Sequence, residues 1–525
     1  MMNSMLLRPQ SKTLISPKVV KKVRFGEISV GKTWCFRKII VFLQKFLFME
    51  KLVGREFEIS ELRRCYESNR SEFIIIYGRR RVGKTFLIDK FFHNTYDFTY
   101  VGGHNLTTAK QLKNFAKAMK KAQRLPHVPK YNDWSEAFDD LEEYLESLPD
   151  DKRKVVFIDE MPWMDTPGSE FVESLEVFWN GWAARRSDIV FVASGSATSW
   201  MVDKLVENQG GLHARITNNI YIRPFTLQET EVYLRNANIA WSRYEILQSY
   251  MIFGGIPFYL SLLNKNQSLV QNIDRLFFRK NGELRVEFYE LYHALFRRAG
   301  MYIDIVHLLA QHREGMTRNE ILKASGIEGK TLTTVLRNLE RCDFIICYSQ
   351  YGNKKKDAIF RLVDFYTLFY YKFIDGDNSK DESWWSGHFQ SHDIEQWEGT
   401  TFELICITHI PQIKKALGIH GVPSSAYSWR AAHDKENGQK GAQIDLVIER
   451  SDHTIHLCEM KFCRGKYRIN EAYEQRLRER METFRTKTQT HDTLLHTMIT
   501  TFGLADGVHT SIIHSQATME NLFEG

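Results

Sequence analysis

One short segment of the chain has the residue types and spacing that hold the phosphates of a nucleotide. It reads Gly78-Arg79-Arg80-Arg81-Val82-Gly83-Lys84-Thr85. A phosphate chain needs backbone N–H donors that converge from an unobstructed loop with a helix N-terminus behind it, and the two glycines permit that path. We expect Lys84 to reach the β- and γ-phosphates and the Thr85 hydroxyl to bind Mg²⁺. The three loop arginines either touch phosphate or form a solvated basic edge, and the alternative for the whole motif is a chance glycine loop.

An acidic pair follows this loop at a suitable distance. Asp159 and Glu160 come directly after an apolar run at 155–158, so both stand at the end of a predicted strand. We expect Asp159 to hold the magnesium ion through water and Glu160 to orient or deprotonate the attacking water. The alternative is a solvated acidic turn.

The elements that position these residues alternate along the chain. Apolar, β-favouring runs are predicted as strands at 73–77, 98–101, 155–158, 189–193 and 221–222, and helical stretches separate them. The run at 73–77 is continuous, as expected for a strand that is buried on both faces of a parallel sheet. The order of strand, glycine loop and helix predicts a doubly wound α/β domain, a P-loop ATPase core, over residues 49–230.

The order of the motifs resembles that of the archaeal-type ATPases, a prokaryotic group within the AAA+/STAND assemblage. The motifs are Val53-Gly54-Arg55-Glu56, the phosphate loop, Phe157-Ile158-Asp159-Glu160, Ser194-Gly195-Ser196 and Gly211-Leu212-His213-Ala214-Arg215. The resemblance covers about residues 50–370. ATP and Mg²⁺ are the expected ligands, and a homo-oligomer is one possible assembly. The resemblance also implies that Ser194 or Ser196 senses the γ-phosphate. Arg215 is implied as an arginine finger or nucleotide sensor, with an ordinary surface arginine as the alternative.

Three further segments are predicted between the ATPase core and the C-terminal part. Residues 231–289 read as a helical lid that is broken by a Gly-Gly-Ile-Pro turn at 254–257. Residues 290–375 show three helices and a hairpin, the pattern of a winged helix-turn-helix, and residues 376–396 read as a linker. Basic residues of the third helix and the wing could meet DNA phosphates; they are Lys330, Arg337, Arg341 and Lys354–Lys356. Acidic neighbours leave the alternative that this unit is an interdomain module.

Charged residues of the C-terminal segment, 397–525, form a second candidate catalytic group. Glu459 and Lys461 share one face of a predicted strand, and a hairpin would bring Asp445 beside them. Asp445 and Glu459 can together hold Mg²⁺ while the lysine stabilises developing negative charge, and Glu403 could supply a further ligand. The pattern resembles the PD-(D/E)xK nuclease fold, a small restriction-endonuclease-like α/β domain, although no proline precedes Asp445. The alternative is a set of ordinary strand charges with a surface salt bridge.

Composition and charge limit the remaining classes of protein. Residues 1–48 hold ten of the 71 basic and one of the 64 acidic residues, which leaves 61 basic and 63 acidic residues for the body, so the body has no overall signature of polyanion binding. The seven scattered cysteines contain no Cys-x-x-Cys pair and fit reduced thiols in a cytoplasmic protein. The apolar stretch at 39–48 is too short to span a membrane, so we expect no stable membrane insertion. Residues 1–48 are interpreted as a disordered basic leader or an over-extended start before Met49.

Together these features predict an ATP hydrolase whose nucleotide state repositions a winged helix and a nuclease-like domain on DNA. The main alternative is a STAND-like switch that binds ATP, turns it over slowly and signals through protein contacts, with an inert C-terminal fold. A third hypothesis, an ATP-dependent motor, has less support because no pore loop is evident.

Overall fold

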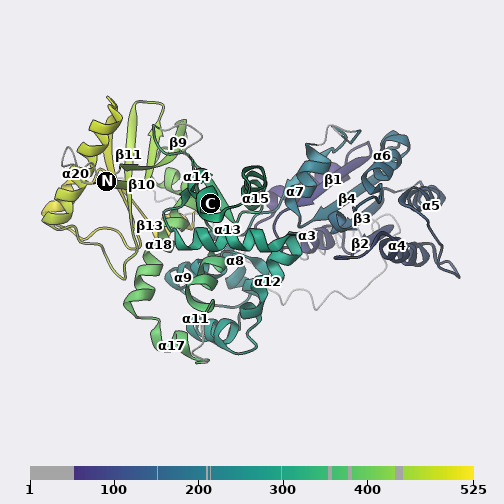
Figure 1. Cartoon of the computed structure of the whole chain (residues 1–525), viewed down its shortest axis with the longest axis horizontal. Coiled ribbons are helices and arrows are strands. Elements are labelled where there is room, and N and C mark those ends of the chain that lie inside the picture. The colour runs from purple at the N-terminus through teal and green to yellow at the C-terminus, as the bar shows by residue number, and fades with distance from the viewer. Residues whose placement is uncertain are drawn as a thin grey trace, which may run out of the picture. The chain divides into compact units, whose positions relative to one another are not determined.

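The computed structural model describes residues 52–150, 152–207, 211–212, 214–296, 298–352, 358–376, 381–431 and 441–524 (Figure 1). The expected leader at 1–48 and the wing lysines Lys354–Lys356 therefore lie outside the described residues. Within the described part of the chain, no helix combines the length and apolar character that a membrane crossing requires.

Five parallel strands form the sheet of the N-terminal domain, in the order β2-β3-β4-β1-β5. The strands are β1 (Glu72–Tyr77), β2 (Phe98–Val101), β3 (Lys154–Asp159), β4 (Ile189–Gly195) and β5 (Asn218–Tyr221). The expected α/β fold with a parallel sheet is thereby confirmed. Only the last strand is displaced, since it lies slightly before its expected place at 221–222.

Helices cover both faces of this sheet, which explains why its strands are apolar without alternation. Along β1, Ile74 and Ile76 belong to one hydrophobic core, whereas Phe73 and Ile75 belong to a second one. The helices α2 (Glu56–Tyr66) and α3 (Lys84–Phe91) contribute to the first core. The helices α4 (Thr108–Gln123), α5 (Trp134–Ser147) and α6 (Phe171–Gly181) contribute to the second.

A helical segment follows the sheet, as expected for the lid. It contains α8 (Leu227–Asn236), α9 (Arg243–Phe253), α10 (Pro257–Ser261), α11 (Leu269–Ile273), η5 (Asp274–Phe278) and α12 (Glu283–Leu295). The predicted break is present: Gly254 ends α9 in a left-handed conformation with φ 62°, and Pro257 occupies the first turn of α10, where its missing N–H costs no hydrogen bond.

The next unit consists of three helices and a small antiparallel sheet. The helices are α13 (Ala299–Gln311), α14 (Arg318–Ser325) and α15 (Gly329–Arg341). The strands β6 (Met316–Thr317), β7 (Ile345–Tyr348) and β8 (Ile359–Leu362) pair in the order β6-β8-β7. Thr317 caps α14 through a reciprocal capping box with Glu320.

The segment that was interpreted as a linker is more ordered than its polar composition indicated. After α16 (Phe365–Phe369) and η7 (Tyr370–Ile374), the chain forms α17 (Trp384–His388) and α18 (His392–Thr408). Trp385 is 4% exposed and its ring contacts those of Phe369 and Phe373. Trp385 is thus a core residue, and Trp384 is partly buried against the same core. The linker interpretation of 376–396 was therefore wrong where α17 and the start of α18 lie.

A second five-stranded sheet forms the C-terminal part, in the order β13-β12-β11-β10-β9. Its strands are β9 (Ser424–Ala431), β10 (Ala442–Arg450), β11 (Thr454–Lys461), β12 (Thr493–Thr500) and β13 (Ser515–Thr518). β9, β10 and β11 pair antiparallel, whereas β11, β12 and β13 pair parallel. The long charged helix α20 (Glu471–Thr488) connects β11 with β12, and α19 (Ile410–Ala416) and α21 (Met519–Leu522) complete this part.

Candidate nucleotide-binding site

The phosphate loop joins β1 to α3 through two glycines that the backbone requires. Gly78 has φ 148°, and a Cβ there would lie 2.3 Å from the carbonyl oxygen of Ile222, so a side chain is excluded by backbone. Gly83 caps α3 with φ 91°, a left-handed conformation that glycine adopts at little cost. Backbone geometry thus accounts for both glycines of the motif.

Lys84 lies at the start of α3 with its side chain buried against the loop. Its Nζ donates to the carbonyl oxygens of Gly78 and Arg79 and to Oγ of Ser196, each at 3.0 Å. Burial lowers the pKa of Lys84, and the carboxylates of Glu160 and Asp159 act in the opposite direction. The ammonium group is therefore fixed beside the loop by three neutral hydrogen-bond acceptors.

Asp159, the first residue of the acidic pair, ends β3 and contacts Thr85 of the phosphate loop. Its Oδ2 accepts a hydrogen bond from Oγ1 of Thr85 at 2.8 Å, and its Oδ1 accepts from the Ser194 hydroxyl. Burial raises the pKa of Asp159, while the hydrogen bond from Ser194 lowers it. A hydroxyl and a carboxylate in contact at this place are the oxygen ligands that suit Mg²⁺, so the residues fit the expected metal.

Glu160 stands directly after β3 in a left-handed conformation with φ 48°. A non-glycine residue in this region of backbone conformation costs roughly 1 kcal/mol or more and is found at functional sites. The Glu160 carboxylate accepts hydrogen bonds from the backbone N–H of Ser196 at 3.1 Å and from the Ser196 hydroxyl. The strained backbone thus aims this carboxylate at the end of the neighbouring strand.

The strand order explains why Ser196 meets both groups. β4 lies between β1, which carries the phosphate loop, and β3, which carries the acidic pair. Because the carboxyl ends of parallel strands meet at one edge of a sheet, Ser196, just after β4, lies between Lys84 and Glu160. Ser194, two residues earlier in β4, is fully buried, and its hydroxyl donates a hydrogen bond to Asp159.

The loop arginines require a correction. Arg79 is 2% exposed, forms an ion pair with Asp364 and lies with its guanidinium carbon 4.7 Å from the ring centre of Phe344. Arg81 makes two hydrogen bonds to Glu287, at 2.9 and 2.7 Å. The solvated basic edge was therefore wrong for these two residues, and their side chains are turned to these carboxylates.

For three predicted residues of this site, the described part of the chain shows no contact that assigns a role in nucleotide binding. Arg80 is half-buried, and its Nε has no hydrogen-bond partner among the described residues. Val82 is buried in the core beneath the loop. Arg215 is exposed on the turn before β5, where its backbone N–H donates to the carbonyl oxygen of Leu212 at 3.0 Å. The role of Arg215 as an arginine finger or nucleotide sensor stays a prediction.

The predicted C-terminal carboxylates come close together, but two of them, Glu459 and Glu403, are bound to protein cations. Glu459 is 4% exposed and accepts hydrogen bonds from the Tyr473 hydroxyl at 3.1 Å and from Arg480 at 2.6 Å. Burial, followed by repulsion from Glu459, raises the pKa of Asp445. Among the described residues, no group of three or more His, Cys, Asp or Glu is arranged to hold a metal ion.

Glu403 and Lys461 complete this C-terminal cluster. Burial, followed by repulsion from Asp445, raises the pKa of Glu403 to about 7, and its carboxylate lies 3.5 Å from a guanidinium nitrogen of Arg361. Lys461 Nζ lies 5.9 Å from the ring centre of Tyr473. Three residues that bind these carboxylates, Arg361, Tyr473 and Arg480, were not predicted from the sequence, although the charges of α20 were a signal for Arg480.

Comparison with known proteins shows what the N-terminal part is similar to. Residues 52–263 match the family model described as an ATPase domain predominantly from Archaea. Residues 52–263 are thus similar to an archaeal-type ATPase domain, and the sheet within them is parallel with the order β2-β3-β4-β1-β5. The expected resemblance to that group is confirmed for this part of the chain.

Individual proteins match this chain either at low sequence identity or over a short stretch. The uncharacterized protein MJECL04 of Methanocaldococcus jannaschii is 27% identical over 375 residues, which are 69% of this chain and 78% of that protein. The uncharacterized ATP-binding protein MJ0423 of the same organism is 52% identical over 42 residues, which are 8% of this chain and 71% of that protein. Among solved structures, the Walker-type ATPase PABY2304 of Pyrococcus abyssi is 19% identical, with a TM-score of 0.42 over 61% of this chain and 96% of that chain.

Proposed function

We propose that the N-terminal domain binds ATP with its 78–85 loop, hydrolyses it slowly and passes the nucleotide state to the unit at 290–375, which we assign as a winged helix. The placement of Ser196 supports this proposal most directly. Its hydroxyl contacts both the ammonium of Lys84 and the carboxylate of Glu160. The group that would bind phosphate and the group that would activate water therefore share one neighbour.

The roles of the residues follow from their present partners. Lys84 donates to two carbonyls and a hydroxyl. Phosphate oxygens would replace these acceptors because their negative charge adds an attraction to the ammonium group that neutral oxygens lack. Glu160 would accept a proton from the attacking water, which requires that it leave Ser196. Thr85 and Asp159 would hold Mg²⁺, which when bound neutralises charge on the phosphates.

Two substitutions test binding and hydrolysis separately. Glu160→Gln keeps the shape of the side chain but removes the base, so it should bind ATP as the wild type does while hydrolysis falls by at least about 100-fold. Lys84→Ala should lose binding itself. Glu173→Gln, at an exposed position of α6, serves as the matched control and should leave both properties unchanged. Unchanged turnover in Glu160→Gln would remove this carboxylate from the mechanism.

Ion pairs between the ATPase domain and the unit at 290–375 support the coupling. Arg341 of α15 donates to Asp203 at 2.6 Å and to Glu207 at 2.8 Å, and Arg337 lies 3.7 Å from Asp203. These are arginines of the helix that was expected to meet DNA. Because they are paired with acidic residues of η4 (Val202–Val206) and its C-terminal end, we favour the STAND-like switch over a protein that acts on DNA.

DNA binding gives the discriminating measurement for these two functions. If the switch interpretation holds, fluorescence anisotropy with a duplex oligonucleotide should show only weak, salt-sensitive binding that does not depend on ATP. ATP should instead change the oligomeric state, and Lys84→Ala should abolish that change. Tight duplex binding that falls on Arg337→Gln would favour the DNA-acting alternative.

We propose no metal-dependent cutting by the C-terminal part, because the carboxylate donors do not fit a metal site. Glu459 is already bound by Arg480 and Tyr473. Plasmid incubated with the protein and Mg²⁺ or Mn²⁺ should therefore remain intact. Nicking that disappears in Asp445→Ala or Lys461→Ala would reinstate the nuclease hypothesis.

A further inference from the structure

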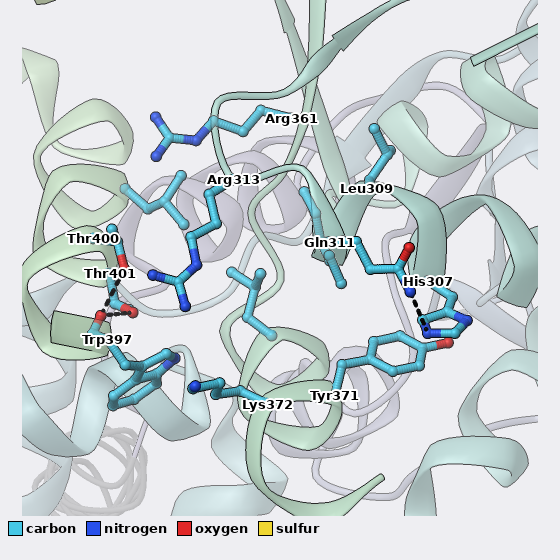
Figure 2. A pocket seen from close by; sticks show the side chains of 14 residues that line it. His307, Leu309, Gln311, Arg313, Arg361, Tyr371, Lys372, Trp397, Thr400 and Thr401 are labelled. Carbon is cyan, nitrogen blue, oxygen red and sulfur yellow. Dashed lines mark hydrogen bonds between the residues drawn. The ribbon is translucent and has the colours of Figure 1, made fainter. Parts of the chain in front are cut away.

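A pocket of about 210 Å³ lies between α13, β8, η7 and α18, and none of its lining residues belongs to the nucleotide site (Figure 2). Three cations line it: Arg313, Arg361 and Lys372. The ends of these three side chains point the same way, toward the helix that carries Trp397 and Thr401 (Figure 2). The described side chains that line the pocket include no carboxylate.

The three cations differ in how far protein groups neutralise them. Arg361 is 7% exposed; its guanidinium lies 3.5 Å from Glu403, and its Nε has no hydrogen-bond partner among the described residues. Lys372 pairs with Asp393, an exposed carboxylate, at 2.7 Å. Arg313 is exposed and lies between the other two in the view. A buried N–H donor without an acceptor costs about 1–3 kcal/mol, so this side of the pocket favours an anionic acceptor.

The remaining lining limits the kind of anion. Trp397, Tyr371 and several leucines supply an apolar, partly aromatic wall. The hydroxyls of Thr400 and Thr401 donate to the carbonyl oxygen of Trp397, at 3.0 and 2.7 Å, so they can act toward a ligand only as acceptors. The volume is below the range of about 300–1,000 Å³ that drug-sized ligands occupy. A single ring or less is therefore the size that fits.

From this geometry we propose that the pocket binds a small phosphate monoester whose apolar part lies against Trp397. The ends of Arg313 and Lys372 lie nearest to Trp397 (Figure 2), and a phosphate monoester offers them three terminal oxygens, whereas one carboxylate offers two. The source of the phosphate is either a free small molecule or the 5′-phosphate end of a nucleic-acid strand.

Calorimetric titration of the full chain tests the proposal, with Lys84→Ala as the background so that the nucleotide loop cannot account for binding. The probes are phenyl phosphate, benzoate and benzyl alcohol. Phenyl phosphate should bind at least about tenfold more tightly than benzoate, and benzyl alcohol should not bind. Equal binding of phenyl phosphate and benzoate, or no binding of phenyl phosphate at millimolar concentration, would overturn the proposal.

Substitutions locate the binding and separate its two sources. Arg313→Gln and Lys372→Gln should each weaken phenyl phosphate binding at least about tenfold, whereas Lys110→Gln, on the exposed face of α4, should not. Unchanged affinity in both pocket variants would place binding elsewhere and refute the assignment. A 5′-phosphorylated oligonucleotide that competes with phenyl phosphate, while its 5′-hydroxyl counterpart does not, identifies a strand end; failure of both to compete identifies a free small molecule.

This inference does not depend on the proposed ATPase activity. Binding of phenyl phosphate in the Lys84→Ala background would stand even if the wild type bound no ATP. Conversely, ATP binding that Lys84→Ala abolishes would stand if the pocket variants showed no effect.

Discussion

Replacing Asp364 by alanine would leave the guanidinium of Arg79 buried without a counter-charge. Both side chains are 2% exposed. Removing one partner of a buried ion pair costs about 3–5 kcal/mol. Asp364 also caps α16 by accepting from the backbone N–H of Thr367 at 2.9 Å, and loss of such a cap costs about 1 kcal/mol. We therefore expect Asp364→Ala to lower the free energy of unfolding by about 4–6 kcal/mol.

Scanning calorimetry measures this loss as a shift of the unfolding transition. Each kcal/mol moves the midpoint by about 2–4 °C for a domain of about 150–250 residues, so the expected drop is about 8 °C or more. Asp364→Asn retains an acceptor for the cap and should lose less. Asp139→Ala, at an exposed position of α5, is the control and should move the midpoint by less than about 2 °C.

A double variant separates the ion pair from other effects of the substitution. Arg79→Met combined with Asp364→Leu removes both charges, and apolar replacement of a whole buried pair is often neutral. The double variant should therefore recover more than half of the loss seen in Asp364→Ala. A drop of less than about 2 °C in Asp364→Ala would refute the reasoning that this pair is buried and charged. So would a double variant whose loss equals the sum of the losses of Arg79→Met and Asp364→Leu measured singly.

Three further predictions concern the backbone, pH and assembly. Gly78→Ala places a Cβ against the carbonyl oxygen of Ile222 and should abolish nucleotide binding measured by calorimetry; wild-type affinity would show that the loop tolerates a side chain. Burial raises the pKa of Glu398 from 4.5 to about 7, so the folded state retains a proton that the unfolded state has lost, and stability falls as pH rises between these values. Glu398→Gln removes this fall in stability. The melting temperature of the variant minus that of the wild type should therefore increase from pH 5 to pH 8, and a difference that stays constant with pH would contradict this. If Arg215 acts across subunits, mixing Arg215→Ala with Lys84→Ala should restore ATP hydrolysis that neither shows alone, and no recovery on mixing would exclude that role.

The geometry of the candidate nucleotide site was predictable because its determinants are local. Two glycines, a lysine and a threonine lie within eight consecutive residues, and the acidic pair directly follows an apolar strand. The sheet was predictable from a local signal as well. Strands of a parallel sheet are buried on both faces by helices, and they are therefore continuous apolar runs in the sequence. Ser196 was predicted as one of two sensors, and the strand order then explains its double contact.

What escaped prediction depends on contacts between distant parts of the chain. Arg79 and Asp364 are 285 residues apart, and no pattern within the loop indicates that its arginine is buried. Trp385 was assigned to a linker because its neighbours are polar, although its ring packs in the core. The C-terminal carboxylates were placed near one another correctly, but the sequence motif could not show that Arg480 and Tyr473 bind Glu459.

Isothermal titration calorimetry with Mg²⁺ and ATP tests the central claim most directly, because the loop, Lys84 and Asp159 must act together to produce binding. Folded wild-type protein should bind ATP with a Kd below about 1 mM, and Lys84→Ala should weaken that binding by at least about tenfold. Absence of any binding heat with ATP or ADP at millimolar concentration, or equal affinity in the two proteins, would contradict the account.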